Sequence, residues 1–181
     1  MFNGDSPQVF WITGLSGSGK STIAEMLRCW LAERGIHAVM LDGDAIRDLV
    51  LDGGGHDRNS RLRIARFNAR LCRFLVGQGL TVICPTISLF HEVQAWNRKH
   101  IPGYVEILLD VPMQELQRRD PKGIYARAKS GELQDVVGLD IRAEYPIAPD
   151  FVLQHYEGVT VEQSFESLAS WMNEPAAGQP H

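Results

Sequence analysis

The stretch from Gly14 to Ser21 reads Gly-Leu-Ser-Gly-Ser-Gly-Lys-Ser and fills every fixed position of the pattern G-x-x-x-x-G-K-[ST]. It follows an apolar run of strand composition at residues 9–13 and precedes a segment with helical spacing of apolar residues. Glycines in such a turn let backbone N–H groups point inward around an anion, and the next helix directs the positive end of its dipole to the same place. The sequence therefore predicts a phosphate-binding loop, with Lys20 reaching the β- and γ-phosphates of a nucleotide and the Ser21 hydroxyl offered to Mg²⁺.

The residues expected to hold the triphosphate of ATP come from this loop and from the first turn of the helix after it. Backbone N–H groups supply most contacts in such loops, and the lysine and the hydroxyl residue supply the others. The predicted nucleotide-binding residues are Gly14, Ser16, Gly17, Ser18, Gly19, Lys20, Ser21 and Thr22. A glycine-rich turn that binds nothing is the alternative, and the complete motif between a strand and a helix argues against it.

Segments of strand composition and amphipathic segments alternate along the whole chain. Strands are predicted at residues 9–13, 37–41, 80–84, 104–110 and 151–153. Helices are predicted at residues 22–31, from residue 45, at 60–76, around 93–96, from Pro112 and at 161–172. This alternation is typical of a three-layer α/β fold with a mainly parallel sheet, here of five strands, as in the P-loop nucleoside triphosphatases.

Length and composition bound the kind of protein. A chain of 181 residues can bury one substantial core, so a single domain is predicted over residues 9–174, with flexible ends at 1–8 and 175–181. The net charge of −4 argues against a nucleic-acid polymer or a membrane surface as the main partner. Neither a signal peptide nor a membrane-spanning run is visible, and three scattered cysteines lack metal-ligand spacing, which favours a cytoplasmic protein.

Two carboxylates stand at the end of the second predicted strand. Asp42 and Asp44 flank Gly43 at the carboxyl end of that strand, where open parallel sheets place their ligands. One carboxylate is suited to accept the proton of an attacking hydroxyl and the other to hold Mg²⁺ through water, because phosphoryl transfer asks mainly for positioning and charge neutralisation. The alternative role is in a turn, or in a helix N-cap in the case of Asp44.

The chain becomes basic and polar from Arg118 to Glu132, where core residues are few. Such a segment is either a solvated face or a mobile cover over phosphates. The second interpretation predicts a lid at about residues 118–140 that closes over the nucleotide and its acceptor and excludes water. Arg119 would then contact ATP, and Lys122 would contact the acceptor.

Several motifs in a fixed order give this chain its family resemblance. After the phosphate-binding loop come Leu-Asp-Gly-Asp at 41–44 with Ile-Arg at 46–47, Ile-Ser at 87–88, Arg-Asp-Pro-Lys-Gly-Ile-Tyr at 119–125, and Gly-Leu-Asp at 138–140 followed by Pro146. With these motifs the chain resembles the adenylylsulfate kinases over about residues 9–153. The loop alone indicates only a nucleotide-binding protein, whereas the stretch 119–125 in order with the others is far more specific.

The resemblance implies an activity and roles for the carboxylates. Adenylylsulfate kinases use ATP to phosphorylate the 3′-hydroxyl of adenosine 5′-phosphosulfate, which gives 3′-phosphoadenosine 5′-phosphosulfate in sulfate assimilation. The resemblance favours Asp44 as the base and leaves Asp42 with Ser21 for Mg²⁺. Family members are commonly dimers, so a homodimer is expected on resemblance alone.

Arginines and one serine are predicted to bind the acceptor nucleotide. Arg47, Arg58 and Arg61 are suited to hold its anionic end through forked guanidinium contacts. Arg58 and Arg61 compete for one role because their helix does not align with the family in a unique register, and a solvated arginine is the alternative for each. Ser88 matches a serine discussed in the family as a phosphorylated intermediate, and we expect it to be a pocket residue or a hydroxyl bonded to backbone.

The acceptor half of the site departs from the family pattern. Two phenylalanines clamp the acceptor's adenine in the family, and here their positions fall in the glycines at 53–55 and at Val136. Each stacking contact on a base contributes roughly 1–3 kcal/mol, so losing both would weaken adenine binding unless another side chain substitutes. His91 stands where an acceptor-binding arginine is expected, and Phe90 is a candidate replacement ring.

Two other functions compete with adenosine phosphosulfate phosphorylation. One is a kinase that uses the same machinery on the 3′-hydroxyl of another nucleotide conjugate, such as the cytidine diphosphate derivative of capsule phosphoramidate synthesis. A pyrimidine presents less surface to an aromatic clamp, which makes the missing phenylalanines less costly. The other is a nucleotide-binding module without catalysis, and the retention of Asp42, Asp44, Arg119 and Lys122 argues against it.

Overall fold

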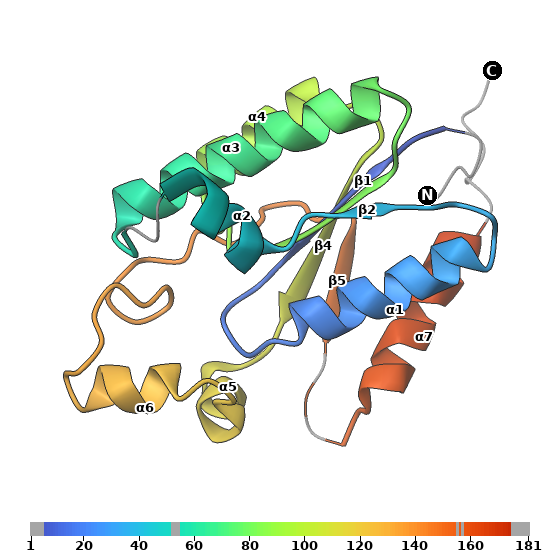
Figure 1. The fold of residues 1–181 in the computed structure, drawn as a ribbon. Helices are drawn as coiled ribbons and strands as arrows, with labels where there is room; N and C mark the ends of the chain where they lie inside the picture. Colours follow the sequence, from blue (N-terminus) through green and yellow to red (C-terminus); the bar gives the residue numbers. More distant parts are fainter. Residues whose placement is uncertain (1–5, 52–54, 155, 157, 175–181) are drawn as a thin grey trace.

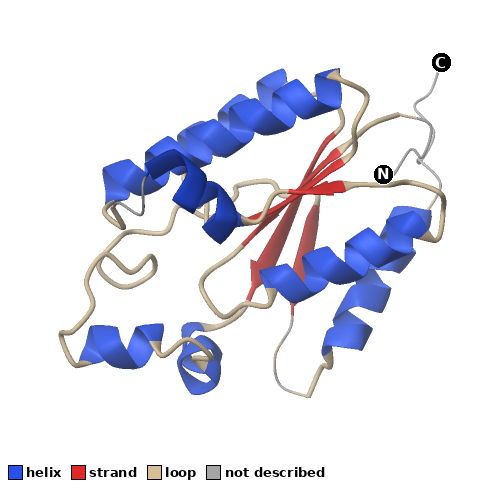
Figure 2. Cartoon of the chain, viewed as in Figure 1, coloured by secondary structure: helices blue, strands red, loops and turns tan. Residues whose placement is uncertain are grey.

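The computed structural model describes residues 6–51, 55–154, 156 and 158–174. In helix α2 the side chains of Asp44, Ala45, Asp48 and Leu51 lie outside the described part. The strands are β1 (Val9–Thr13), β2 (Val39–Met40), β3 (Val82–Thr86), β4 (Tyr104–Asp110) and β5 (Phe151–Gln154). They form one sheet in the order β2-β3-β1-β4-β5 with every pair parallel, which confirms the predicted five-stranded parallel sheet (Figure 2).

Helices cover both faces of this sheet (Figure 1). The helices are α1 (Lys20–Ala32), α2 (Gly43–Leu51), α3 (Arg58–Gly77), α4 (His91–His100), α5 (Met113–Arg119), α6 (Ile124–Lys129) and α7 (Val161–Asn173). Phe10 and Ile12 of β1 belong to the core that α1 and α7 complete, whereas Val9 and Trp11 belong to the core of α3 and α4. Because both faces are buried, β1 reads as a continuous apolar run.

Several boundaries differ from the prediction. The strand expected at 37–41 is regular only over Val39–Met40, at the edge of the sheet, although the Leu41 N–H still donates to the Ile83 carbonyl (2.9 Å). Helix α2 begins at Gly43, so Asp44 lies inside the helix backbone and the N-cap expectation is wrong. Pro112 is the residue before α5 rather than part of its first turn. Gln8, expected in the outer segment 1–8, is 4% exposed and its carbonyl accepts a hydrogen bond from the Val82 N–H (2.8 Å).

The parallel arrangement decides where a ligand can lie. The loop after β1 and the ends of β2 and β3 meet at the carboxyl edge of the sheet. This is the point at which the strand order changes direction, since β3 lies on one side of β1 and β4 on the other. Open α/β sheets bind ligands at such points. No helix in the described ranges is long and apolar enough to cross a membrane.

Candidate active site

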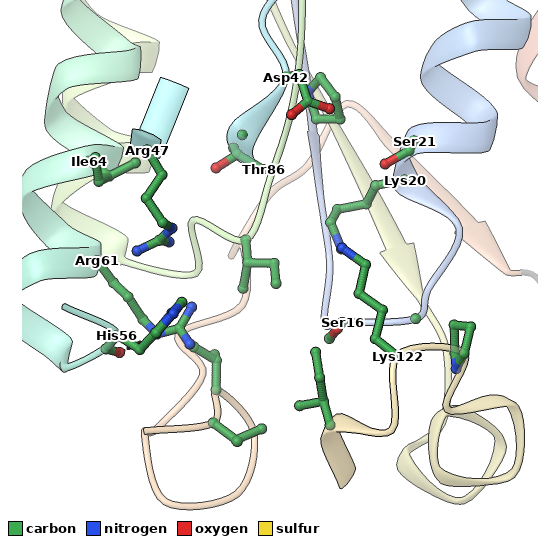
Figure 3. A pocket seen from close by; sticks show the side chains of 18 of the residues that line it. Ser16, Lys20, Ser21, Asp42, Arg47, His56, Arg61, Ile64, Thr86 and Lys122 are labelled. Atoms are coloured by element: carbon green, nitrogen blue, oxygen red, sulfur yellow. Dashed lines mark hydrogen bonds between the residues drawn. The ribbon is translucent and has the colours of Figure 1, made fainter. Parts of the chain in front are cut away.

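A cavity of about 680 Å³ opens at this edge of the sheet (Figure 3). The phosphate-binding loop and the start of α1 form one wall, the start of α2 and α3 forms the opposite wall, and residues from the 118–140 segment close the third side. Ten of the residues predicted from sequence line it: Ser16, Gly17, Gly19, Lys20, Ser21, Thr22, Asp42, Arg47, Arg61 and Lys122. Residues far apart in the chain are therefore gathered around one space.

The phosphate-binding loop is held in shape by close backbone contacts. Gly14 has a φ of 152°, and a Cβ there would come within 2.7 Å of the Leu109 carbonyl oxygen, so only glycine fits. The Lys20 amine donates to the Leu15 carbonyl (2.6 Å) and to the Ser18 hydroxyl (3.4 Å). Gly14 and Ser18 do not line the cavity, and the Ser18 side chain is fully buried. These two residues support the shape of the loop on the side that faces away from the cavity.

Oxygen donors suited to Mg²⁺ stand beside the loop. Asp42, just after β2, and Ser21, in the first turn of α1, both border the cavity, and Figure 3 shows the carboxylate and the hydroxyl. Mg²⁺ prefers oxygen ligands and is usually held by one or two protein groups together with substrate phosphates. This donor set fits the ion. Asp44, the predicted base, follows Gly43 of the cavity wall, and its side chain lies outside the described part.

The far end of the cavity carries two neighbouring guanidinium groups. Arg47 donates to the Gly55 carbonyl (2.9 Å), and Arg61 donates to the carbonyls of His56 (2.6 Å) and Asp135 (2.8 Å). Burial first, and then the positive charge of Arg47, lower the pKa of Arg61. Two cations that repel each other in a half-buried site favour an anion between them.

The structure distinguishes Arg61 from its competitor. Arg58 lies outside the cavity wall, where its guanidinium pairs with Glu144 (3.1 Å) and lies 5.3 Å from the centre of the Phe90 ring. Ser88 is fully buried, and its hydroxyl has no hydrogen-bond partner among the described residues. It does not line the cavity, so the expectation of a pocket serine is wrong and so is that of a hydroxyl bonded to backbone.

The basic segment contributes two cations to the cavity. Lys122 lines it, together with Arg127 of α6, a residue to which no specific role was assigned from sequence. Arg119 does not line it in this structure, and its Nε pairs with Glu115 (2.7 Å). Hydrogen bonds from Arg118 and Arg119 lower the pKa of Glu115 to about 2. Positive charge is concentrated at the cavity. Among the described lining residues, Asp42 is the one carboxylate, whereas five side chains are cationic: Lys20, Arg47, Arg61, Lys122 and Arg127.

The surroundings of the acceptor end lack the expected ring. Val136 lines the cavity and is 4% exposed, but Phe90 is buried in the core between the sheet and α3–α4, so it does not replace a clamp residue. His91 is also absent from the wall, with its Nε2 at 2.8 Å from the Tyr145 carbonyl. Among the described lining residues the one aromatic ring is that of His56, which the sequence did not single out because no motif contains it.

A family model described as Adenylylsulphate kinase matches residues 6–154. Two curated relatives illustrate the range of similar proteins. A cytidine diphosphoramidate kinase from Campylobacter jejuni is 38% identical over 164 residues, which are 91% of this chain and 95% of the relative. An adenylyl-sulfate kinase from Marinobacter nauticus is 36% identical over 93% of this chain and 85% of the relative.

A solved structure shares this architecture. The Mycobacterium tuberculosis APS kinase CysC in complex with AMPPNP and APS superposes with a TM-score of 0.83 at 32% identity, covering 93% of this chain and 99% of that one. The arrangement of parallel sheet, phosphate-binding loop and flanking helices is thus that of the P-loop kinases.

Proposed function

This chain belongs to the adenylylsulfate kinase family, and from that premise we propose that it transfers the γ-phosphoryl group of ATP to the 3′-hydroxyl of a nucleotide. Adenosine 5′-phosphosulfate is the leading acceptor, with 3′-phosphoadenosine 5′-phosphosulfate as the product. The observation that carries the proposal is a single cavity with a phosphate-binding loop at one end and paired guanidinium groups at the other. Such a cavity suits two anionic substrates facing each other.

In this proposal the chain's own residues divide the work. Backbone N–H groups of the loop and the Lys20 amine bind the β- and γ-phosphates, and Lys122 and Arg127 add positive charge from the third side. Arg47 and Arg61 hold the anionic end of the acceptor, and Asp44 accepts the proton of its hydroxyl. Ser21 and Asp42 would hold Mg²⁺, which neutralises charge on the phosphate oxygens when bound.

A second acceptor is supported by the missing clamp. No Phe, Tyr or Trp ring lines the described part of the cavity, so a large purine gains less stacking than in a two-ring clamp. The Campylobacter jejuni relative is named for a cytidine diphosphate conjugate. A cytidine diphosphoramidate or a similar conjugate is therefore the second candidate for the same 3′-hydroxyl chemistry.

Acceptor identity can be tested by ADP release with both kinds of nucleotide. We expect turnover with adenosine 5′-phosphosulfate at micromolar to millimolar concentration, because the anionic phosphosulfate of that acceptor and the triphosphate of ATP both have cationic counterparts in the cavity. Cytidine diphosphate conjugates are assayed in parallel under identical Mg²⁺ and ATP. Turnover of the cytidine conjugate with none of the sulfate nucleotide at millimolar concentration would replace the leading acceptor with the second.

The two competing arginines give a matched pair of variants. Arg61→Ala should raise the KM for the acceptor about tenfold or more, because charge-assisted hydrogen bonds contribute about 1.5–3 kcal/mol each. Arg58→Ala should leave that KM within about twofold, because its guanidinium pairs with Glu144 outside the cavity. The KM for ATP serves as the internal reference in both. A larger effect from Arg58→Ala than from Arg61→Ala would contradict the assignment.

A further inference from the structure

The segment at residues 120–125 touches the phosphate-binding loop through Tyr125. The Tyr125 hydroxyl donates a hydrogen bond of 2.9 Å to the carbonyl oxygen of Ser16, 109 residues away in sequence. The ring is only 4% exposed and packs in a core cluster with Leu15 of the loop and Leu116 of α5. Burial raises the pKa of Tyr125 to about 12, so the hydroxyl is protonated and able to donate at neutral pH.

This contact fixes the direction of a peptide group in the loop. The peptide between Ser16 and Gly17 is trans, so its carbonyl and its N–H point in opposite directions. Tyr125 holds the carbonyl, and therefore the Gly17 N–H is directed away from Tyr125. Ser16 and Gly17 line the cavity whereas Tyr125 does not. Phosphate-binding loops work by turning such N–H groups toward the anion.

Tyr125 is itself held firmly at the start of α6. The carboxylate of Asp120 accepts hydrogen bonds from the backbone N–H groups of Tyr125 (3.2 Å) and Ala126 (2.9 Å). Pro121 lies against the loop as well, since a Cβ built on Gly17 would be 3.6 Å from the Pro121 Cδ. The segment thus touches the loop at two points, on either side of Lys122, which faces the cavity (Figure 3).

We propose that Tyr125 is a positioning residue for the nucleotide: its hydroxyl orients the Ser16–Gly17 peptide so that the Gly17 N–H faces the triphosphate. The phosphate cradle is then complete only when the 120–125 segment is seated on the loop. Nucleotide binding and seating of this segment are therefore coupled, because each stabilises the other. The inference concerns ATP alone and holds whichever acceptor the enzyme uses.

The variant Tyr125→Phe removes the hydroxyl and keeps the buried ring. We expect the Kd for AMPPNP, measured by calorimetry, to rise about three- to tenfold, the range given by the net contribution of one hydrogen bond. The KM for the acceptor should stay within about twofold. Hydrogen exchange in the peptide that contains residues 14–19 should become faster in the nucleotide-free protein. Tyr145→Phe is the matched control, because Tyr145 is 40% exposed and does not border the cavity.

Two results would overturn the proposal. An unchanged Kd for AMPPNP in Tyr125→Phe would show that the Ser16–Gly17 peptide keeps its orientation without the hydroxyl. Equal increases in AMPPNP Kd and acceptor KM, accompanied by a lower melting temperature, would show that Tyr125 supports the fold in general rather than the nucleotide cradle.

Discussion

Replacing Asp44 with alanine should lower kcat by about two to four orders of magnitude while the affinity for ATP stays nearly unchanged. A positioned general base contributes that factor, and its loss removes an interaction made with the reacting hydroxyl rather than with the bound nucleotide. The backbone of Asp44 lies in the first turn of α2, directly after Asp42 and Gly43 of the cavity wall. Single-turnover rates at saturating ATP and acceptor, with AMPPNP affinity by calorimetry, provide the measurement.

Asp42→Ala is the companion variant that separates the two carboxylates. If Asp42 holds Mg²⁺ with Ser21, this variant should need a higher Mg²⁺ concentration for half-maximal activity, and Asp44→Ala should not. The pair also tests the alternative of a binding module without catalysis. Tight AMPPNP binding with no turnover of any nucleotide acceptor in the unmodified protein would favour that alternative, and equal loss of kcat and ATP affinity in Asp44→Ala would remove Asp44 as the base.

The nucleotide half of the site could be predicted from sequence because its residues are contiguous. A loop that follows a strand and opens a helix has one geometry, so Ser16, Lys20 and Ser21 reach the cavity by local rules alone. The sheet was predictable for a similar reason, since strands buried on both faces read as continuous apolar runs. Only their ends shifted, most of all in β2, where a single neighbour supplies the ladder.

The acceptor half of the site depends on contacts between segments that are distant in sequence, and such contacts cannot be predicted from local sequence patterns. Arg58 and Arg61 lie only three residues apart on α3. Arg58 lies outside the cavity because it pairs with Glu144, 86 residues away in sequence. Arg61 lies at the cavity wall, where it donates to the carbonyl of Asp135, 74 residues away. Phe90 was a candidate for stacking on the acceptor's base, but the packing of α4 on the sheet places its ring in the core. His56 and Arg127 belong to no local pattern, so only the assembled cavity reveals them.

Lys20→Ala should lower kcat/KM for ATP by about three orders of magnitude or more. Removing one preorganised donor from a site of developing charge costs about 10²–10³ in rate, and Lys20 also contributes a full positive charge. In this structure the Lys20 amine already lies along the loop, bonded to the Leu15 carbonyl and the Ser18 hydroxyl. The amine is thus held beside the loop that binds the β- and γ-phosphates.

Lys20→Arg is the control that distinguishes charge from geometry. It keeps the positive charge but places a wider, planar group where the loop closes around a compact amine, so it should recover less than a tenth of the lost activity. The melting temperature of Lys20→Ala should stay within a few degrees of the unmodified protein, because Ser18 still donates its N–H to the Leu15 carbonyl (3.3 Å). Activity above a tenth of the unmodified level in Lys20→Ala would mean that Lys122 and Arg127 carry the triphosphate, and that the 120–127 segment rather than the loop is the principal phosphate site.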